Sequence, residues 1–135
     1  MSHVQTSSVR LVRFLFCDTS SIIRGKTTHV EKLKPRLEEG IGLVKGTMAM
    51  NLLDVGQGDT GYGAVGEVRL VPDPDTFLIL PYAPNSALLL CDMFELDHTP
   101  WALCPRNILK KQIAKAAEMG IAIEGAFEPE FMLGN

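Results

Sequence analysis

The chain has 135 residues, of which 46% are hydrophobic and 21% are charged, and its formal net charge is −3. This size and composition are typical of one compact globular domain and exclude wholesale disorder. The small negative charge, with no run of basic residues, gives no electrostatic reason to bind nucleic acid, and no apolar run reaches the roughly 18 residues of a membrane helix.

The cysteines and the N-terminus indicate the compartment. The sequence has three cysteines, Cys17, Cys91 and Cys104, and no C-x-x-C pair. An odd number of cysteines without such a pair favours a reduced protein over a disulfide framework. Arg13 interrupts the first apolar stretch, and no small-residue cleavage site follows it, so the sequence does not predict a signal peptide. We therefore expect a cytoplasmic protein that associates with neither nucleic acid nor membrane.

The first predicted elements form a hairpin followed by a helix. Apolar residues alternate over 9–17 and predict a strand, "DTSS" predicts a turn, and "IIRGKTTHV" predicts a second strand. The segment "KLKPRLEEG" places Leu33 and Leu37 four residues apart, with Pro35 in a first turn and Gly40 as a stop. This spacing predicts a short helix.

A glycine-dense segment, "GQGDTGYGAVG", covers residues 56–66 and contains two overlapping G-x-G-x-x-G matches. Such glycines let backbone amides approach a phosphate, but a nucleotide site needs a strand before the loop and a helix directly after it. Here the strand-like "EVRLV" follows. The pattern therefore favours a mobile connection, in which Asp54 and Asp59 are the candidate functional residues.

The second half of the chain predicts further strands and one main helix. "EVRLVPD", "FLIL" and the long apolar "SALLLCDMFEL" predict strands, the last of them central. "PRNILKKQIAKAAEMG" predicts the main helix, with Pro105 at its first position, Gly120 beyond its end, and an apolar stripe of Leu109, Ile113 and Ala116. A last strand is predicted in "IAIEGAFEPEFML". The order predicts an α+β fold with a mixed or antiparallel sheet.

The last predicted strand carries Glu128 and Glu130 around a proline. Alternation places both glutamates on one face, with their stems roughly 7 Å apart. This spacing suits two metal ions about 3.5–4 Å apart, each bound by one glutamate, and carboxylate oxygens are the ligands that Mg²⁺ and Mn²⁺ prefer. Two alternatives stay open, a solvated acidic face on an edge strand and a general acid–base pair. From spacing alone, the solvated face is favoured.

Taken together, these segments resemble the N-terminal part of the glutamine synthetase family. The similar segments are the opening hairpin "VRFLFCDTSSIIRGK", the strand–turn–strand run "VPDPDTFLILPYAPNSALLLCDMFE", the helix "CPRNILKKQIAKAAEMG" and the strand "GAFEPEFML". Two departures stand out. Cys104 replaces the aspartate usual before Pro-Arg, which removes an N-cap worth about 1 kcal/mol. The loop around Asp54 lacks the family's F-D-G-S-S pattern, so Asp59 competes with Asp54.

The resemblance implies a β-grasp (ubiquitin-like) mixed sheet with one main helix over residues 1–103. It also implies the beginning of a truncated catalytic domain, a helix plus a metal-binding strand, over 104–135. The implied activity joins glutamate to ammonia in glutamine biosynthesis, with ATP as co-substrate and a γ-glutamyl phosphate intermediate. Mg²⁺ or Mn²⁺ is the implied cofactor.

The resemblance also assigns residue roles. Glu128 matches a ligand of the metal shared with the nucleotide phosphates, and Glu130 matches a ligand of the metal nearer glutamate. Asp54 falls near an aspartate that reaches across a subunit boundary to bind ammonium. The family forms homo-oligomeric rings, and most of its ATP pocket lies beyond this chain, so no nucleotide-binding residue is expected here.

Two further alternatives remain at the level of the sequence. The divergent loop is similar to family members that ligate polyamines or other amines instead of ammonia. A stand-alone β-grasp binding module without catalysis is the other alternative. Because family members are several times longer, we expect this chain to be a fragment that is inactive alone.

Overall fold

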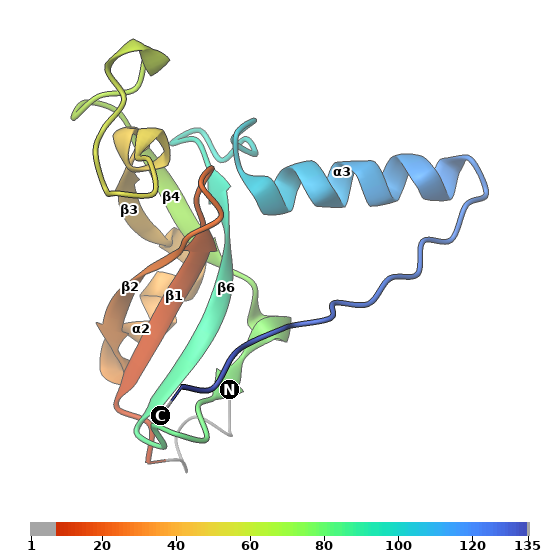
Figure 1. Ribbon diagram of the computed structural model, residues 1–135. Coiled ribbons are helices and arrows are strands. Elements are labelled where there is room, and N and C mark those ends of the chain that lie inside the picture. Colours follow the sequence, from red (N-terminus) through yellow and green to blue (C-terminus); the bar gives the residue numbers. More distant parts are fainter. Residues whose placement is uncertain (1–7, 135) are drawn as a thin grey trace.

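The computed structural model describes residues 8–134, which form a mixed sheet with a helix at either side (Figure 1). The strands are β1 (Leu11–Cys17), β2 (Ile23–His29), β3 (Ile41–Val44), β4 (Glu67–Pro72), β5 (Leu78–Ile79) and β6 (Ser86–Phe94). The helices are α2 (Leu33–Glu39) and α3 (Pro105–Glu118), with short 3₁₀ turns η1 (Val30–Lys32), η2 (Lys45–Ala49), η3 (Gly58–Thr60) and η4 (Pro74–Thr76).

The sheet order is β2-β1-β6-β4-β3, with β5 paired to β6. β1 and β6 are parallel, and every other pair is antiparallel. The predicted hairpin is confirmed, since Leu11 pairs with His29 and Cys17 with Ile23. The α+β class with a mixed sheet is therefore confirmed, and β6 is the central strand.

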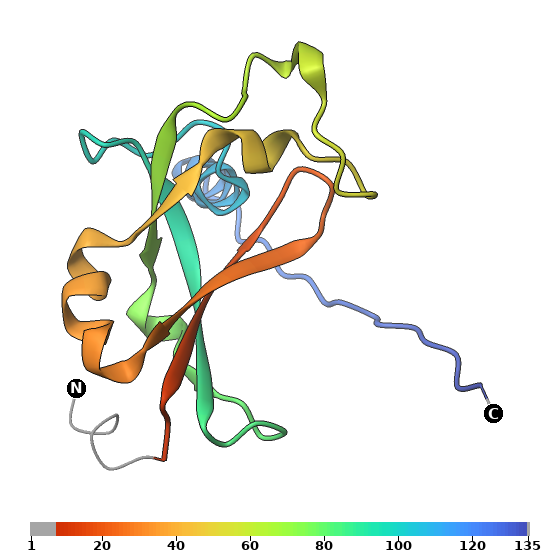
Figure 2. The ribbon, with the colours of Figure 1, turned by 90° about the vertical axis from the view of Figure 1, so that its left-hand side faces the viewer.

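The strands form where the sequence alternates. In β1, Val12, Phe14 and Phe16 are buried while Arg13 is exposed, so one face of the strand enters the core. The larger buried set comes from both halves of the chain and from α2, which lies against the sheet in Figure 2. Its members are Val9, Val12, Phe14, Phe16, Leu33, Leu43, Met48, Val68, Leu70, Ala87, Leu89, Cys91, Met93, Trp101 and Cys104.

β3 was not predicted from the sequence. It is only four residues long and lies between Gly40, whose φ is 68°, and the 3₁₀ turn η2. A run of this length is too short to show alternation. Its position is fixed by pairing with β4, in the register Ile41 to Leu70 and Val44 to Glu67.

The main helix α3 leaves the sheet at its first turn and projects away from it (Figure 1). Its predicted apolar stripe faces outward, because Leu109 is 59% and Ile113 50% exposed, and α3 has no buried residue. The helix bounds are confirmed, and the predicted apolar stripe is exposed in the part of the chain that the structure describes.

The last predicted strand does not form. Segment 121–134 has no regular secondary structure and its residues are exposed. A strand needs a partner for its N–H and C=O groups, and residues 8–134 offer it none. Among these residues, also, no helix combines the length and apolarity needed to cross a membrane.

Candidate functional site

The predicted site residues lie in two separate parts of the molecule. Asp54 lies in the loop between η2 and β4, at one end of the sheet, while Glu128 and Glu130 lie in segment 121–134. In Figure 1 this terminal segment runs from the far end of α3 back past the sheet toward its lower end, whereas the loop that contains Asp54 lies at the upper end of the sheet. The described chain does not bring the two parts together.

Asp54 sits at the tip of a tight turn over residues 51–55. The side-chain Oδ1 of Asn51 accepts hydrogen bonds from the backbone N–H of Leu53 at 2.9 Å and of Val55 at 3.1 Å. The Asp54 N–H donates to the Asn51 carbonyl at 3.0 Å, and Asp54 has a φ of 58°. Aspartate tolerates this left-handed conformation better than most residues, so the turn presents a carboxylate at its tip.

The carboxylate of Asp54 is bound by Arg24 of β2. An Arg24 terminal nitrogen donates to Asp54 Oδ1 at 2.5 Å, and Arg24 Nε donates to Asp18 Oδ2 at 2.5 Å. Asp18 is buried and also accepts from the backbone N–H of Ser20 and Ile22. Burial raises the pKa of Asp18, but the bonds from Arg24, Ile22 and Ser20 outweigh it, so this pKa lies below its ordinary value.

The hairpin turn between β1 and β2 is also bound to the chain that leads into the Asp54 turn. The Thr19 hydroxyl donates to the Met48 carbonyl at 2.6 Å, and the Ser20 hydroxyl donates to the Met50 carbonyl at 2.9 Å. These bonds bring residues some 30 positions apart into one polar unit at the end of the sheet. This unit was not predicted from the sequence, although "CDTSSIIR" contains an acid, three hydroxyl residues and an arginine within eight residues.

The glycine-dense loop is anchored at its C-terminal half. Tyr62 packs edge-on against buried Trp101, with ring centroids 5.9 Å apart, and Lys45 lies 5.8 Å from the Trp101 ring centroid. A side chain at Gly46 would overlap the Gly63 carbonyl, so the loop passes directly over η2. The loop runs into β4 and not into a helix, which removes the geometry of a phosphate cradle.

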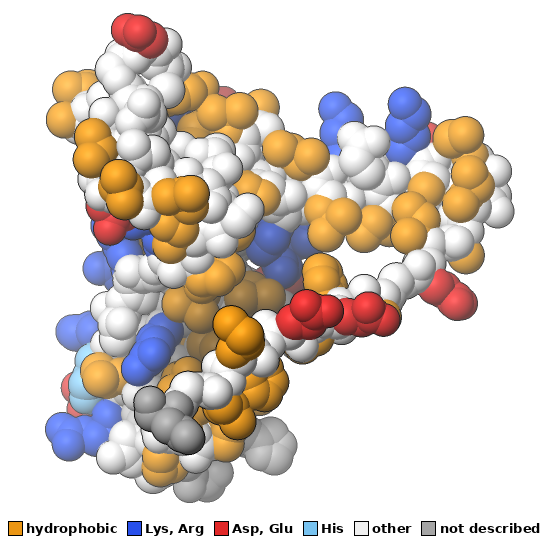
Figure 3. Space-filling view, viewed as in Figure 1, with side chains coloured by type: hydrophobic (Ala, Val, Ile, Leu, Met, Phe, Trp, Pro, Cys, Tyr) orange, Lys and Arg blue, Asp and Glu red, His pale blue; other side chains and the backbone are white. Residues whose placement is uncertain are grey.

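Glu128 and Glu130 are exposed. Figure 3 shows acidic side chains along the terminal segment. Within 8–134, no group of three or more His, Cys, Asp or Glu side chains is placed to hold a metal ion. Carboxylates are suitable oxygen donors for Mg²⁺ or Mn²⁺, but Mg²⁺ requires six near-octahedral ligands. The two glutamates therefore fit as part of a donor set, which further ligands must complete.

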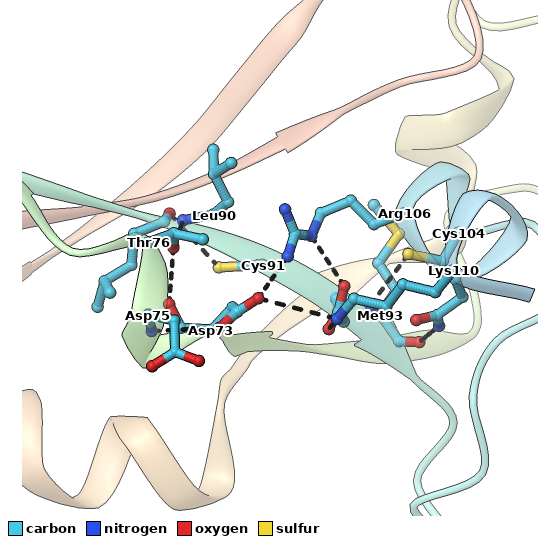
Figure 4. A network of polar contacts seen from close by, with 12 residues as sticks. Asp73, Asp75, Thr76, Leu90, Cys91, Met93, Cys104, Arg106 and Lys110 are labelled. Carbon is cyan, nitrogen blue, oxygen red and sulfur yellow. Dashed lines mark hydrogen bonds and ion pairs between the residues drawn. The ribbon is translucent and has the colours of Figure 1, made fainter. Parts of the chain in front are cut away.

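A second polar network, also missed, joins α3 to the sheet (Figure 4). Arg106 donates to Asp92 Oδ1 at 2.9 Å and to Asp73 Oδ2 at 2.5 Å, and Lys110 Nζ contacts Asp92 Oδ2 at 2.5 Å. Asp92 is buried in β6. A charged residue inside the apolar run "SALLLCDMFEL" is the signal that a cation must come from elsewhere in the chain.

The first turn of α3 is also bound to the backbone of β6, through the side chains of Cys104 and Asn107. The Met93 N–H donates to Cys104 Sγ at 3.3 Å, and Asn107 Nδ2 donates to the Met93 carbonyl at 2.8 Å. Cys104 gives α3 no side-chain cap, as predicted, because its buried sulfur faces β6. Burial raises the pKa of the neighbouring Cys91 thiol to about 12, so Cys91 stays protonated.

Comparison with known proteins gives one family. Residues 1–101 match the family model described as glutamine synthetase N-terminal domain. The chain is 27% identical over 146 residues to a gamma-glutamylanilide synthase of Acinetobacter sp., covering 98% of this chain and 29% of that protein. It is 31% identical over 137 residues to a glutamine synthetase of Mycobacterium bovis, covering 96% and 28% respectively.

Solved structures agree with this comparison. A crystal structure described as a novel glutamine synthase homolog superposes with a TM-score of 0.76 and 30% identity, covering 82% of this chain and 27% of that one. The chain thus spans less than a third of the length of the curated relatives it matches.

Proposed function

Because the chain belongs to the glutamine synthetase family, we propose that it is the N-terminal part of an ATP-dependent ligase that joins glutamate to ammonia. The observation that carries this proposal is the family match over residues 1–101. The γ-carboxylate of glutamate would first be phosphorylated by ATP, and ammonia would then displace phosphate to form glutamine. The expected assembly is a homo-oligomeric ring in the cytoplasm.

A second candidate is ligation of another amine in place of ammonia. The supporting observation is the similarity to a relative named gamma-glutamylanilide synthase, which is 27% identical over nearly the whole chain. The Asp54 turn departs from the family's usual sequence, and it is this turn that the resemblance assigns to the amine. Aniline and polyamines are therefore substrates to test beside ammonium.

In this proposal Asp54 binds the amine. Its carboxylate side chain is 66% exposed and is held at the tip of the 51–55 turn. A carboxylate stabilises an ammonium ion by charge and by accepting its N–H bonds, and it takes up a proton when the amine attacks. Asp59 is the alternative residue for this role, since it lies in the same exposed loop.

Glu128 and Glu130 are proposed as metal ligands, one for each of two Mg²⁺ or Mn²⁺ ions. When bound, such ions neutralise the phosphate oxygens of ATP and the transferring phosphoryl group. Here the chain supplies two exposed carboxylates in segment 121–134, and the other ligands would have to come from outside it. We also propose that residues 1–103 form the N-terminal domain and that 104–135, with α3 and the proposed metal-binding segment, begin the catalytic domain.

The test is an assay of the product of the complete open reading frame that encodes this chain. We expect phosphate release that requires both ATP and glutamate, with ammonium, aniline or putrescine as the acceptor. Glu130→Ala should weaken Mn²⁺ binding in a direct titration and slow turnover, while Glu124→Ala in the same segment is the matched control. The 135-residue chain alone should release no phosphate. Absence of amine-dependent turnover with every acceptor would contradict the proposed function.

A further inference from the structure

Arg24 connects two carboxylates that belong to different parts of the chain. Its Nε is 2.5 Å from Asp18 Oδ2 and one terminal nitrogen is 2.5 Å from Asp54 Oδ1. The side chains of Asp18, Arg24 and Asp54 are 0%, 18% and 66% exposed, so this Asp18/Arg24/Asp54 ion chain runs from the interior to the surface.

The inner end of the ion chain is rigid. Asp18 Oδ1 accepts from the backbone N–H of Ser20 at 2.8 Å and of Ile22 at 2.9 Å, which fixes the carboxylate within the hairpin turn. Its other oxygen, Oδ2, is then directed at Arg24. Because the carboxylate is buried and fully bound, the guanidinium that pairs with it is held in one orientation.

The outer end depends on Arg24. The backbone of the 51–55 turn is closed by the bonds from Asn51 and by a bridge between Met50 and Gly56. Those bonds close the turn but do not reach the Asp54 side chain, which joins the tip of the turn to β2 through Arg24. In the part of the chain that the structure describes, Arg24 is the one side chain paired with the Asp54 carboxylate, through Oδ1 alone.

We propose that Arg24 is a positioning residue for the amine, an inference that rests on the proposed function of Asp54. By occupying Oδ1, Arg24 orients the carboxylate so that Oδ2 accepts an N–H bond from the ammonium or amine. Arginine is suited to this position because its planar guanidinium donates from two separated nitrogens in a fixed geometry, whereas lysine presents one ammonium on a flexible stem. Lysine at position 24 keeps the charge but cannot hold both carboxylates in this way.

The kinetic test compares Arg24→Lys with the unmodified full-length ligase. We expect the KM for the amine to rise roughly tenfold, because one charge-assisted hydrogen bond to Asp54 is lost. The KM values for glutamate and ATP should stay unchanged, which a general loss of folding would not produce. Arg13→Lys is the matched control, since Arg13 is an exposed arginine on the neighbouring strand β1. An active Arg24→Lys enzyme with an unchanged amine KM would overturn the proposal.

A second measurement does not depend on activity. Hydrogen exchange on the 135-residue chain should show faster exchange of the Leu53, Val55 and Gln57 amides in Arg24→Lys, with β6 amides unchanged. Asp54→Asn, which leaves the Arg24–Asp18 pair intact, should produce the same local change. If the unmodified ligase turns over no amine, the proposed function fails, and the exchange data alone then decide whether Arg24 holds the turn. Identical exchange in all three proteins would refute the positioning role.

Discussion

At the scale of single residues, Asp18 makes the stability of the fold depend on pH. Its pKa in the folded chain lies below the ordinary value of 3.8, because the bonds from Arg24, Ile22 and Ser20 outweigh the effect of burial. As the pH falls, the unfolded chain therefore binds this proton first. The stabilisation from ionised Asp18 is fully present above the unfolded pKa and is lost as the pH falls through the folded pKa.

We therefore predict that Asp18→Asn reduces the dependence of the unfolding free energy on pH below about pH 4. Urea titrations between about pH 2 and pH 6 measure it, and the two proteins should differ most at the upper end of that range. Asp97→Asn is a useful comparison, because the Thr99 bonds lower the pKa of Asp97 in an exposed loop. Parallel pH profiles for wild-type and Asp18→Asn would contradict the prediction.

At the scale of elements, the strands and helices with strong patterns were predicted and those that depend on partners were not. The alternation of Val12, Phe14 and Phe16 was enough to predict β1, and Pro105 with Gly120 bounded α3. Segment 121–134 alternates as clearly, yet forms no strand, because alternation specifies a face and not the neighbour that completes the ladder.

Some residues of the candidate site were likewise identified from the sequence, whereas others became evident only in the structure. Asp54, Glu128 and Glu130 were identified from the family resemblance, and their roles remain predictions. The residues that hold Asp54 in place were not identified, because Asp18 and Arg24 each lie 30 or more positions away in sequence. Ion pairs over such separations follow from the sheet topology, which places the β1–β2 turn beside residues 48–54.

The attachment of α3 also belongs to this scale and is open to test. Arg106→Ala removes the cation that joins Asp73 of the β4–β5 connection to Asp92 of β6. We predict a loss of about 2 kcal/mol in unfolding free energy, the usual size for charged hydrogen bonds that are partly buried. Urea denaturation measures this loss, and Lys111→Ala, on the exposed face of the same helix, is the control. Equal stability of the two variants would show that the Arg106 ion pairs with Asp73 and Asp92 do not hold the first turn of α3 to the sheet.

At the scale of the whole molecule, the exposed apolar surface of α3 and of the terminal segment predicts self-association of this chain. Along α3, Ile108, Leu109 and Ile113 are 47%, 59% and 50% exposed, and in the segment that follows Phe127 and Phe131 are 100% and 80% exposed. A surface of this kind is reduced when two copies bury it against each other.

Sedimentation velocity over a range of concentrations should therefore show a sedimentation coefficient that rises with concentration. The double substitution Leu109→Lys and Ile113→Lys should weaken association roughly tenfold or more, because burial of each aliphatic side chain contributes about 1.5–3 kcal/mol. Replacing Lys111 and Lys115 by glutamine, on the polar face of the same helix, should leave association as strong as in the wild type. A monomer at all concentrations would contradict the predicted self-association. Equal weakening by both double substitutions would mean that charge on α3, and not the apolar stripe, controls association.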